Sequence, residues 1–108
     1  MKRGDLITIA IQGDFGKPRP ALVVQNDRVD STPKVLVCPL TRNTSPAPSL
    51  RLAVGSTPAN GLREVSSIMV SSVIAVPRER CGTVIGSLTP EQMQEIDIRL
   101  AFVLGLAG

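Results

Sequence analysis

Alternating hydrophobic and polar positions run through the first three quarters of the chain and predict short β-strands. In residues 5–12, Ile7, Ile9 and Ile11 fall on one face of an extended segment, which is the period of a strand. Further apolar runs follow, and loops rich in glycine, proline, serine and asparagine separate them. The predicted strands are residues 5–12, 19–26, 33–41, 50–54, 65–70 and 73–77.

The period changes near residue 89, and the new spacing predicts a C-terminal helix. Thr89 is the expected N-cap, with Pro90 at the first helical position and Gln92 completing a capping box. Gly105 is expected to close the helix. The apolar face of this helix consists of Met93, Ile96, Leu100, Val103 and Leu104. This face packs either on the core of the same chain or on a partner helix, and we expect the core.

These elements predict a mainly β fold, a small barrel of five to seven strands with a C-terminal α-helix. A short, twisted, mostly antiparallel sheet usually curls into a barrel, because closure hides its edges. The run at 33–41 is apolar on both faces, so we expect it at the centre of the sheet. A length of 108 residues fits one domain covering residues 1–108.

Composition excludes several classes of protein. With 43% hydrophobic residues the chain is not disordered, and no apolar run approaches the ~20 residues of a membrane span. The N-terminal segment lacks the features of a signal peptide, so we expect a cytoplasmic protein with Cys38 and Cys81 reduced. The lack of histidine excludes Ser–His and Cys–His catalysis. Acidic residues do not cluster, so no metal or other cofactor is expected.

Positive charge is concentrated ahead of the predicted helix. Residues 1–88 carry eleven of the 12 Lys and Arg residues and six of the 9 acidic residues, a net charge of about +5. Nine of the 12 cations in the whole chain are arginines, whose planar guanidinium suits phosphate. This distribution is compatible with a polyanionic partner and also with an ordinary solvated surface.

Arg19 lies between Pro18 and Pro20 at the start of a predicted strand. A residue before proline is restricted to extended conformations, and proline has a fixed φ, so the backbone of Arg19 is preset from both sides. A preset cation loses little conformational entropy when it binds an anion, as electrostatic preorganisation requires. The alternative is that Arg19 caps loop carbonyls or pairs with Asp14.

Thr41 ends the apolar run at 33–41 and is followed by Arg42 and Asn43. Side chains at strand ends can line a groove while the sheet holds them rigidly. The alternatives are that Thr41 simply terminates its strand and that Arg42 is solvated.

Two loops are expected to flank such a groove. The first loop supplies Gln12, Asp14, Phe15 and Lys17, and the second supplies Asn43, Thr44 and Ser45. Phe15 either stacks on a nucleic-acid base or plugs the end of the barrel. An aromatic content of 2% argues against the multi-aromatic stacking surfaces of common RNA-binding sheets.

The order of these motifs resembles the MazF/PemK toxins of prokaryotic toxin–antitoxin systems. The resemblance extends from about Lys2 to Leu106. It rests chiefly on RGD at 3–5, KPRPALVVQND at 17–27, CPLT at 38–41 and IGSLT at 85–89.

The resemblance implies an SH3-like barrel, related to the CcdB gyrase poisons, and an endoribonuclease activity. Members of the family, also called mRNA interferases, are homodimers that cut single-stranded RNA at short sequences without a metal. A cognate antitoxin neutralises them by laying an extended segment over the RNA groove. The expected reaction is attack by the RNA 2′-hydroxyl, which leaves a 2′,3′-cyclic phosphate and a 5′-hydroxyl.

The resemblance also assigns roles to residues. It implies that Arg19 and Thr41 are the pair around the scissile phosphate. The implied RNA-binding residues are Gln12, Asp14, Phe15, Lys17, Arg42, Asn43 and Ser71.

Two departures from the family pattern concern the proton acceptor. Many members carry an acidic residue just after the strand that corresponds to 65–70, where this chain has Ser71 and Ser72. Some relatives have a histidine or glutamate in the first loop, which is shorter here. Asp14 and Glu64 are candidates by their chemistry alone.

Two other functions are compatible with the same fold. A CcdB-like gyrase poison acts through the end of its C-terminal helix, but residues 100–108 here are apolar and look like core or dimer surface. A catalytically weak paralogue would bind RNA in the same groove without turnover. Endoribonuclease activity is the function that the sequence favours.

Overall fold

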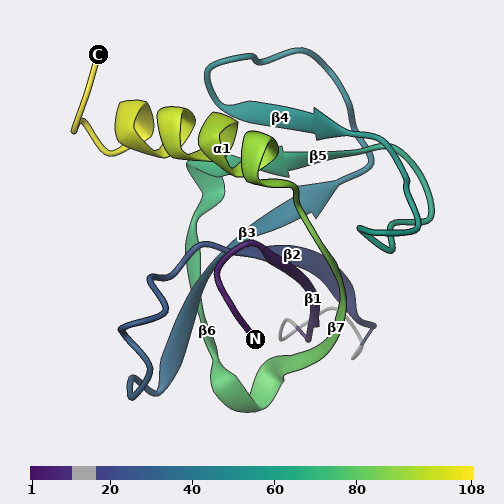
Figure 1. Cartoon of the computed structure of the whole chain (residues 1–108), viewed down its shortest axis with the longest axis vertical. Coiled ribbons are helices and arrows are strands. Elements are labelled where there is room, and N and C mark those ends of the chain that lie inside the picture. The colour runs from purple at the N-terminus through teal and green to yellow at the C-terminus, as the bar shows by residue number, and fades with distance from the viewer. Residues whose placement is uncertain (11–16) are drawn as a thin grey trace.

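The structure, a computed structural model, describes residues 1–10 and 17–108. In this part of the chain, 7 strands form one antiparallel sheet in the order β4–β5–β3–β2–β1–β7, with β6 paired to β3, and a helix follows (Figure 1). The predicted mainly β fold with a C-terminal helix is confirmed. The elements are β1 (Asp5–Ile9), β2 (Arg19–Val23), β3 (Lys34–Thr41), β4 (Arg51–Val54), β5 (Ser66–Met69), the 3-10 helix η1 (Val70–Ser72), β6 (Ile74–Pro77), the 3-10 helix η2 (Arg78–Arg80), β7 (Cys81–Ser87) and α1 (Pro90–Val103).

β3 is the strand on which the sheet is built. It pairs with β6 through its first half and with β2 through its middle. Its last two residues, Leu40 and Thr41, pair with β5. The predicted central position is therefore confirmed. The expectation that both faces of β3 are apolar and covered holds only in part, because Leu36 is 43% exposed.

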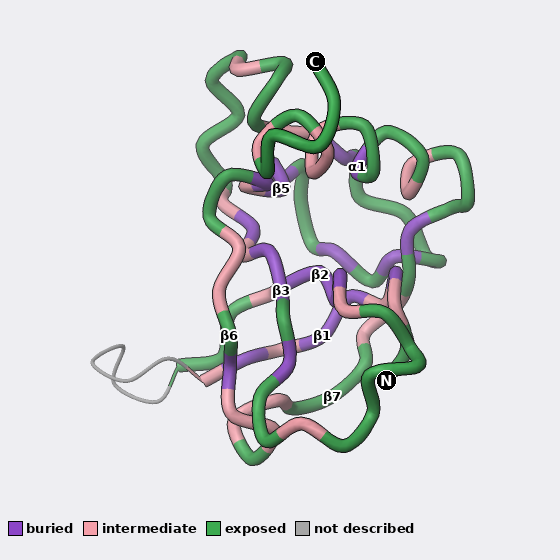
Figure 2. The backbone as a smooth tube through the Cα atoms, turned by 90° about the vertical axis from the view of Figure 1, so that its left-hand side faces the viewer, coloured by how far each residue is buried: buried purple, intermediate pink, exposed green. Residues whose placement is uncertain are grey.

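Two apolar clusters form the core and share the strands β1, β2 and β3. Ile7 and Ile9 of β1 belong to one cluster, and Leu6 belongs to the other, with Ile96 of α1. Because neighbouring residues of a strand point to opposite faces, β1 buries both of its sides. Figure 2 accordingly shows buried residues concentrated in the strands. No helix in the described chain is long and apolar enough to cross a membrane.

The helix begins where the sequence predicts. The Thr89 hydroxyl accepts a hydrogen bond from the backbone N–H of Gln92 at 3.1 Å, and the Gln92 side-chain oxygen accepts one from the backbone N–H of Thr89 at 2.9 Å. This reciprocal pair satisfies two N–H groups that the first helical turn leaves without partners. The predicted capping box is confirmed.

The apolar face of α1 is confirmed with one exception. Ile96 is fully buried, and three further members pack against the same core: Met93, Leu100 and Val103. Leu104 is 61% exposed instead, because the helix ends before it. Gly105 follows with φ +74°, a left-handed conformation that favours glycine, so its predicted role in closing the helix is confirmed.

β7 has no counterpart among the predicted strands, and Cys81 is its first residue. Two glycines interrupt the apolar pattern there. A β-carbon on Gly86 would lie 2.4 Å from the backbone of Asn60, so close packing between segments explains the glycine. The strand forms because it pairs with β1, a contact that local sequence does not reveal.

Both cysteines are free thiols, as expected. Burial raises the pKa of the Cys38 thiol from its ordinary value of 9.0 to about 11, and the nearby charge of Arg3 offsets a smaller part. Burial also raises the pKa of Cys81, which is only partly buried.

The Cys38 thiol makes the stability of the protein depend on pH. The unfolded chain loses the thiol proton near pH 9.0, whereas the folded chain keeps it until about pH 11. Because the folded state then binds more protons, the free energy of unfolding falls as the pH rises between these values. Urea unfolding measured from pH 8 to pH 11 should show that the free energy of unfolding of wild type falls by on the order of 2 kcal/mol more than that of Cys38→Ala. Cys81→Ala is the control and should flatten the curve less; parallel curves for wild type and Cys38→Ala would contradict the assignment.

Candidate functional site

The pairing of β2 with β3 brings the start of one strand toward the end of the other. The ladder runs from Val23 opposite Val37 to Ala21 opposite Pro39. Arg19 is the first residue of β2, two positions before Ala21, and Thr41 is the last residue of β3, two positions after Pro39. Two residues far apart in sequence therefore lie toward the same end of the sheet.

Thr41 is held from several directions. It pairs with Ser67 of β5, and its hydroxyl oxygen accepts a hydrogen bond from the backbone N–H of Asn43 at 3.1 Å. This contact fixes the rotamer of Thr41 and uses the oxygen as an acceptor, so the hydroxyl proton can be donated to a ligand.

Arg19 and Thr41 both line a groove of about 770 Å³. The groove lies between the start of β2, the end of β3 and the segment 61–66, and part of β1 and β7 contributes to its wall. Among the described residues, its charged lining comprises four cations and one carboxylate: Lys17, Arg19, Arg42, Arg63 and Glu64. Such a surplus of positive charge favours binding of a polyanion.

Glu64, the one carboxylate among the described residues of the groove, forms an ion pair with Arg42. Arg42 Nε lies 2.7 Å from Glu64 Oε1, and the side chains are 77% and 53% exposed. An exposed pair of this kind contributes little to stability, typically 0–1 kcal/mol, because water screens it. A bound anion can therefore rearrange the pair at low cost.

The predicted site residues fall into four groups. Lys17, Arg19, Thr41 and Arg42 line the groove together. Asn43 lies beside it, and its side-chain oxygen accepts hydrogen bonds from the backbone N–H and the hydroxyl of Ser45. Ser71 is exposed in η1 and does not line the groove. Gln12, Asp14 and Phe15 lie outside the described residues.

Sequence reasoning missed the wall of the groove formed by residues 61–66. Arg63 was not predicted, and Glu64 was named only as a proton acceptor. Gly61 has φ +67°, which turns the chain, and a β-carbon there would lie 2.0 Å from the carbonyl oxygen of Ile85. The Asn60–Gly61 pair was a turn signal in the sequence, but its position beside β3 depends on the pairing with β5.

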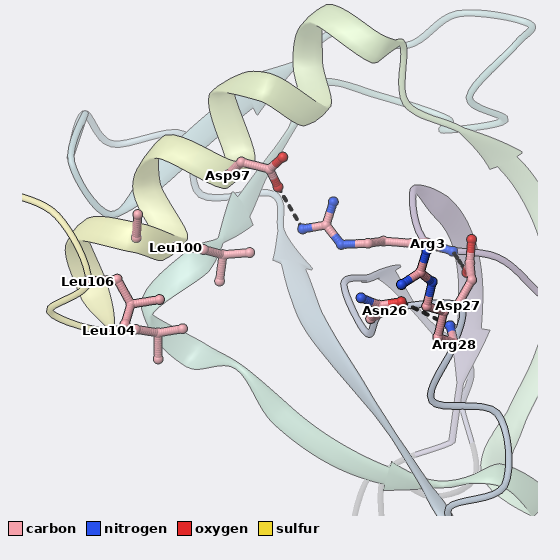
Figure 3. A pocket seen from close by; sticks show the side chains of 9 residues that line it. Arg3, Asn26, Asp27, Arg28, Asp97, Leu100, Leu104 and Leu106 are labelled. Carbon is pink, nitrogen blue, oxygen red and sulfur yellow. Dashed lines mark hydrogen bonds and ion pairs between the residues drawn. The ribbon is translucent and has the colours of Figure 1, made fainter.

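A second cleft, of about 670 Å³, lies between the N-terminal segment and the end of α1 (Figure 3). Arg3 Nη2 reaches across to Asp97 Oδ1 at 2.6 Å. Leucines from the end of the chain form the other wall. None of the predicted catalytic or RNA-binding residues that the structure describes lines this cleft, so the groove with Arg19 and Thr41 is the candidate site. In the described chain no group of three or more His, Cys, Asp or Glu side chains could hold a metal ion.

Comparison with known proteins identifies the family. Residues 2–104 match the family described as "PemK-like, MazF-like toxin of type II toxin-antitoxin system". The chain belongs to the PemK/MazF toxin family. It is also 44% identical, over 100% of both chains, to a curated protein of Mycolicibacterium smegmatis named "Probable endoribonuclease MazF". The resemblance seen in the sequence is thereby confirmed.

Solved structures of MazF proteins share the fold. The chain matches an endoribonuclease in complex with its cognate antitoxin from a mycobacterial species with a TM-score of 0.80, at 25% identity over 100% of this chain and 98% of that one. It matches the Mycobacterium tuberculosis toxin MazF-mt6 with a TM-score of 0.80, at 21% identity over 96% of this chain and 99% of that one. A MazE–MazF structure from Deinococcus radiodurans also has a TM-score of 0.80, at 20% identity over 99% and 97% of the two chains.

The wall of the MazF-family groove should depend on Gly61. Gly61→Ala forces a side chain into a left-handed conformation and against the Ile85 backbone, so the free energy of unfolding should fall by at least about 2 kcal/mol. Gly55→Ala is the matched control, because nothing lies within 4 Å of a β-carbon there, and it should change stability by no more than about 0.5 kcal/mol. Chemical denaturation of both variants measures the difference, and equal effects would contradict the close approach.

Proposed function

We propose that this MazF-family toxin cleaves single-stranded RNA at short sequences, without a metal, by attack of the RNA 2′-hydroxyl on the adjacent phosphate. The products are a 2′,3′-cyclic phosphate and a 5′-hydroxyl. The observation that carries the proposal is that Arg19 and Thr41 line one groove, in which the described residues also include Lys17, Arg42 and Arg63. The family match and the name of the curated relative support it.

Arg19 stabilises the charge that builds up on the phosphate during the reaction. As the 2′-oxygen attacks, negative charge grows on the non-bridging oxygens, and a guanidinium offers two parallel N–H donors to a pair of oxygens. Pro18 and Pro20 preset the backbone of Arg19, so less ordering is needed when the phosphate arrives. Arginine remains protonated in proteins, which makes it a poor proton acceptor.

Thr41 supplies a second hydrogen bond to the same phosphate. Its oxygen already accepts the Asn43 backbone N–H, which leaves the hydroxyl proton for a non-bridging oxygen. Because Thr41 pairs with Ser67 of β5, the sheet holds the donor in place and little reorganisation is needed when the phosphate binds.

The remaining cations hold the RNA backbone on either side of the scissile bond. Lys17, Arg42 and Arg63 line the groove and would contact flanking phosphates. Splayed bases of a single strand can then be read by hydrogen bonds and stacking. The roles of Gln12, Asp14, Phe15, Asn43 and Ser71 in RNA binding remain part of this proposal.

A cognate antitoxin would neutralise the toxin by covering the same groove in the cytoplasm. One of the similar solved structures is an endoribonuclease in complex with its cognate antitoxin, which supports such a partner. An extended segment with acidic side chains would match the surplus of positive charge.

We further propose that the toxin is a homodimer. The C-terminal end of the chain exposes large apolar side chains that the protomer does not cover, and exposed apolar patches often mark interfaces. Ile98 and Phe102, four residues apart on one helical face, are 64% and 48% exposed. Leu104 and Leu106 extend this surface at 61% and 77% exposed.

Substitution of Arg19 and of Thr41 tests the proposed activity. Arg19→Ala should nearly abolish cleavage of a long single-stranded RNA in the presence of a chelator, and Thr41→Ala should slow it about 100- to 1,000-fold. Circular dichroism should show that both variants fold, and mapping of the wild-type product ends should find 2′,3′-cyclic phosphates.

Arg28→Ala, outside the groove, is the matched control for loss of one arginine and should cut like wild type. Wild-type rates for Arg19→Ala would refute the assignment. Intact RNA together with inhibited gyrase supercoiling would favour a CcdB-like poison instead.

A charge placed on the exposed face of α1 tests the dimer. Ile98→Arg should convert dimers into monomers, because a desolvated, unpaired charge at an apolar interface is costly. Sedimentation equilibrium measures the mass of each form. Val29→Arg, at a 46% exposed residue outside α1, is the control and should remain dimeric. A dimeric Ile98→Arg would exclude this face as the seam.

A further inference from the structure

The proposed cleavage requires a group that removes the proton of the RNA 2′-hydroxyl. The chain contains no histidine, and arginine is too weak a base for this task. Among the described residues that line the groove, Glu64 is the sole carboxylate, set among four cations. In the part of the groove that the structure describes, Glu64 is therefore the one side chain with the chemistry of a general base.

The sheet places Glu64 on the opposite side of Thr41 from Arg19. Thr41 pairs with Ser67 of β5, so the residues just before Ser67 run alongside the end of β3. The Ser66 hydroxyl donates a hydrogen bond to the Glu64 backbone carbonyl at 3.1 Å, which holds the turn that presents Glu64. Arg19 belongs to β2, on the other flank of β3. A phosphate held by Thr41 would thus have the guanidinium on one side and the carboxylate on the other.

The ion pair with Arg42 orients the carboxylate and leaves it usable. Arg42 follows Thr41 directly and contacts Glu64 through Oε1 at 2.7 Å. Among the described residues the carboxylate has no further hydrogen bond or ion pair, so Oε2 can accept a proton. At 53% exposed, Glu64 is also accessible to a strand of RNA lying in the groove.

We propose that Glu64 is the general base of this toxin, an inference that rests on the proposed cleavage of RNA. Its Oε2 takes the proton of the 2′-hydroxyl as the 2′-oxygen forms a bond to phosphorus. The bond between phosphorus and the 5′-oxygen breaks on the opposite side, and the 5′-oxygen takes a proton from water. The hydroxide left behind removes the proton from Glu64, which restores the carboxylate. No other reactant is consumed.

The test is the single-turnover rate of cleavage at saturating RNA. Glu64→Gln keeps the shape of the side chain but cannot accept the proton, so the rate should fall about 100-fold or more. Glu64→Asp keeps a carboxylate one methylene shorter and should cut at least about tenfold faster than Glu64→Gln. Binding of an RNA with a 2′-deoxy nucleotide at the cleavage site should be as tight for Glu64→Gln as for wild type, or tighter, because an anion has left a basic groove. Glu79→Gln removes one carboxylate outside the groove and should cut like wild type.

Arg42→Gln separates a chemical role from a structural one. This variant breaks the same ion pair but retains the Glu64 carboxylate, so its saturated rate should fall less than that of Glu64→Gln. An equal fall would mean that Glu64 acts only by holding Arg42, and it would overturn the proposal. A wild-type rate for Glu64→Gln, or loss of RNA binding in step with the rate, would overturn it as well. If wild type itself leaves RNA intact, the proposed function fails before the role of Glu64 is tested.

Discussion

The antiparallel pairing of β3 with both of its neighbours is the constraint on which the rest of the structure depends. A slip of one residue in a sheet turns every side chain to the other face. Here Leu40 and Ile68 pair across β3 and β5 and both lie in the core, so a slip would expose them. The free energy of core burial therefore fixes the register. The same register sets Thr41 opposite Ser67 of β5, so the end of β3 that lines the groove is positioned when the core folds.

Local chemistry accounts for the parts of the fold that could be predicted from the sequence. The start of α1 could be predicted because the side chains of Thr89 and Gln92 form hydrogen bonds to backbone N–H groups of the first turn, and both residues are close together in sequence. The run at 33–41 was predicted to be central because a strand paired on both sides is largely apolar. β7 was not predicted because its glycines interrupt the apolar pattern. They are required by close packing against other segments, such as Gly86 against Asn60. Its pairing with β1 depends on residues far away in the sequence.

In the candidate site, too, some features could be predicted from local sequence and others depend on strand pairing. The backbone of Arg19 could be argued from its two prolines, and Thr41 from its place at a strand end. That the two residues belong to one site was implied by the resemblance to a family, because their approach depends on strand pairing that no local pattern specifies. Arg63 was missed for a related reason: it lies in a turn at Gly61 whose place beside the groove depends on the pairing of β5. Glu64 could be suggested by its chemistry, but only the fold puts it in the groove with Thr41.

The charge of the groove also links the proposed substrate to the proposed inhibitor. Among the residues that the structure describes, four cations and one carboxylate line a single surface, and like charges held close together disfavour the folded state. Any anion that enters relieves this repulsion, and a ligand that binds only the folded chain stabilises it by mass action. RNA and an acidic segment of an antitoxin would relieve the same repulsion through the same side chains, so they would compete for one surface. The interactions that make the groove suited to phosphate therefore also make the toxin open to neutralisation, and a substitution that weakens one partner through charge should weaken the other.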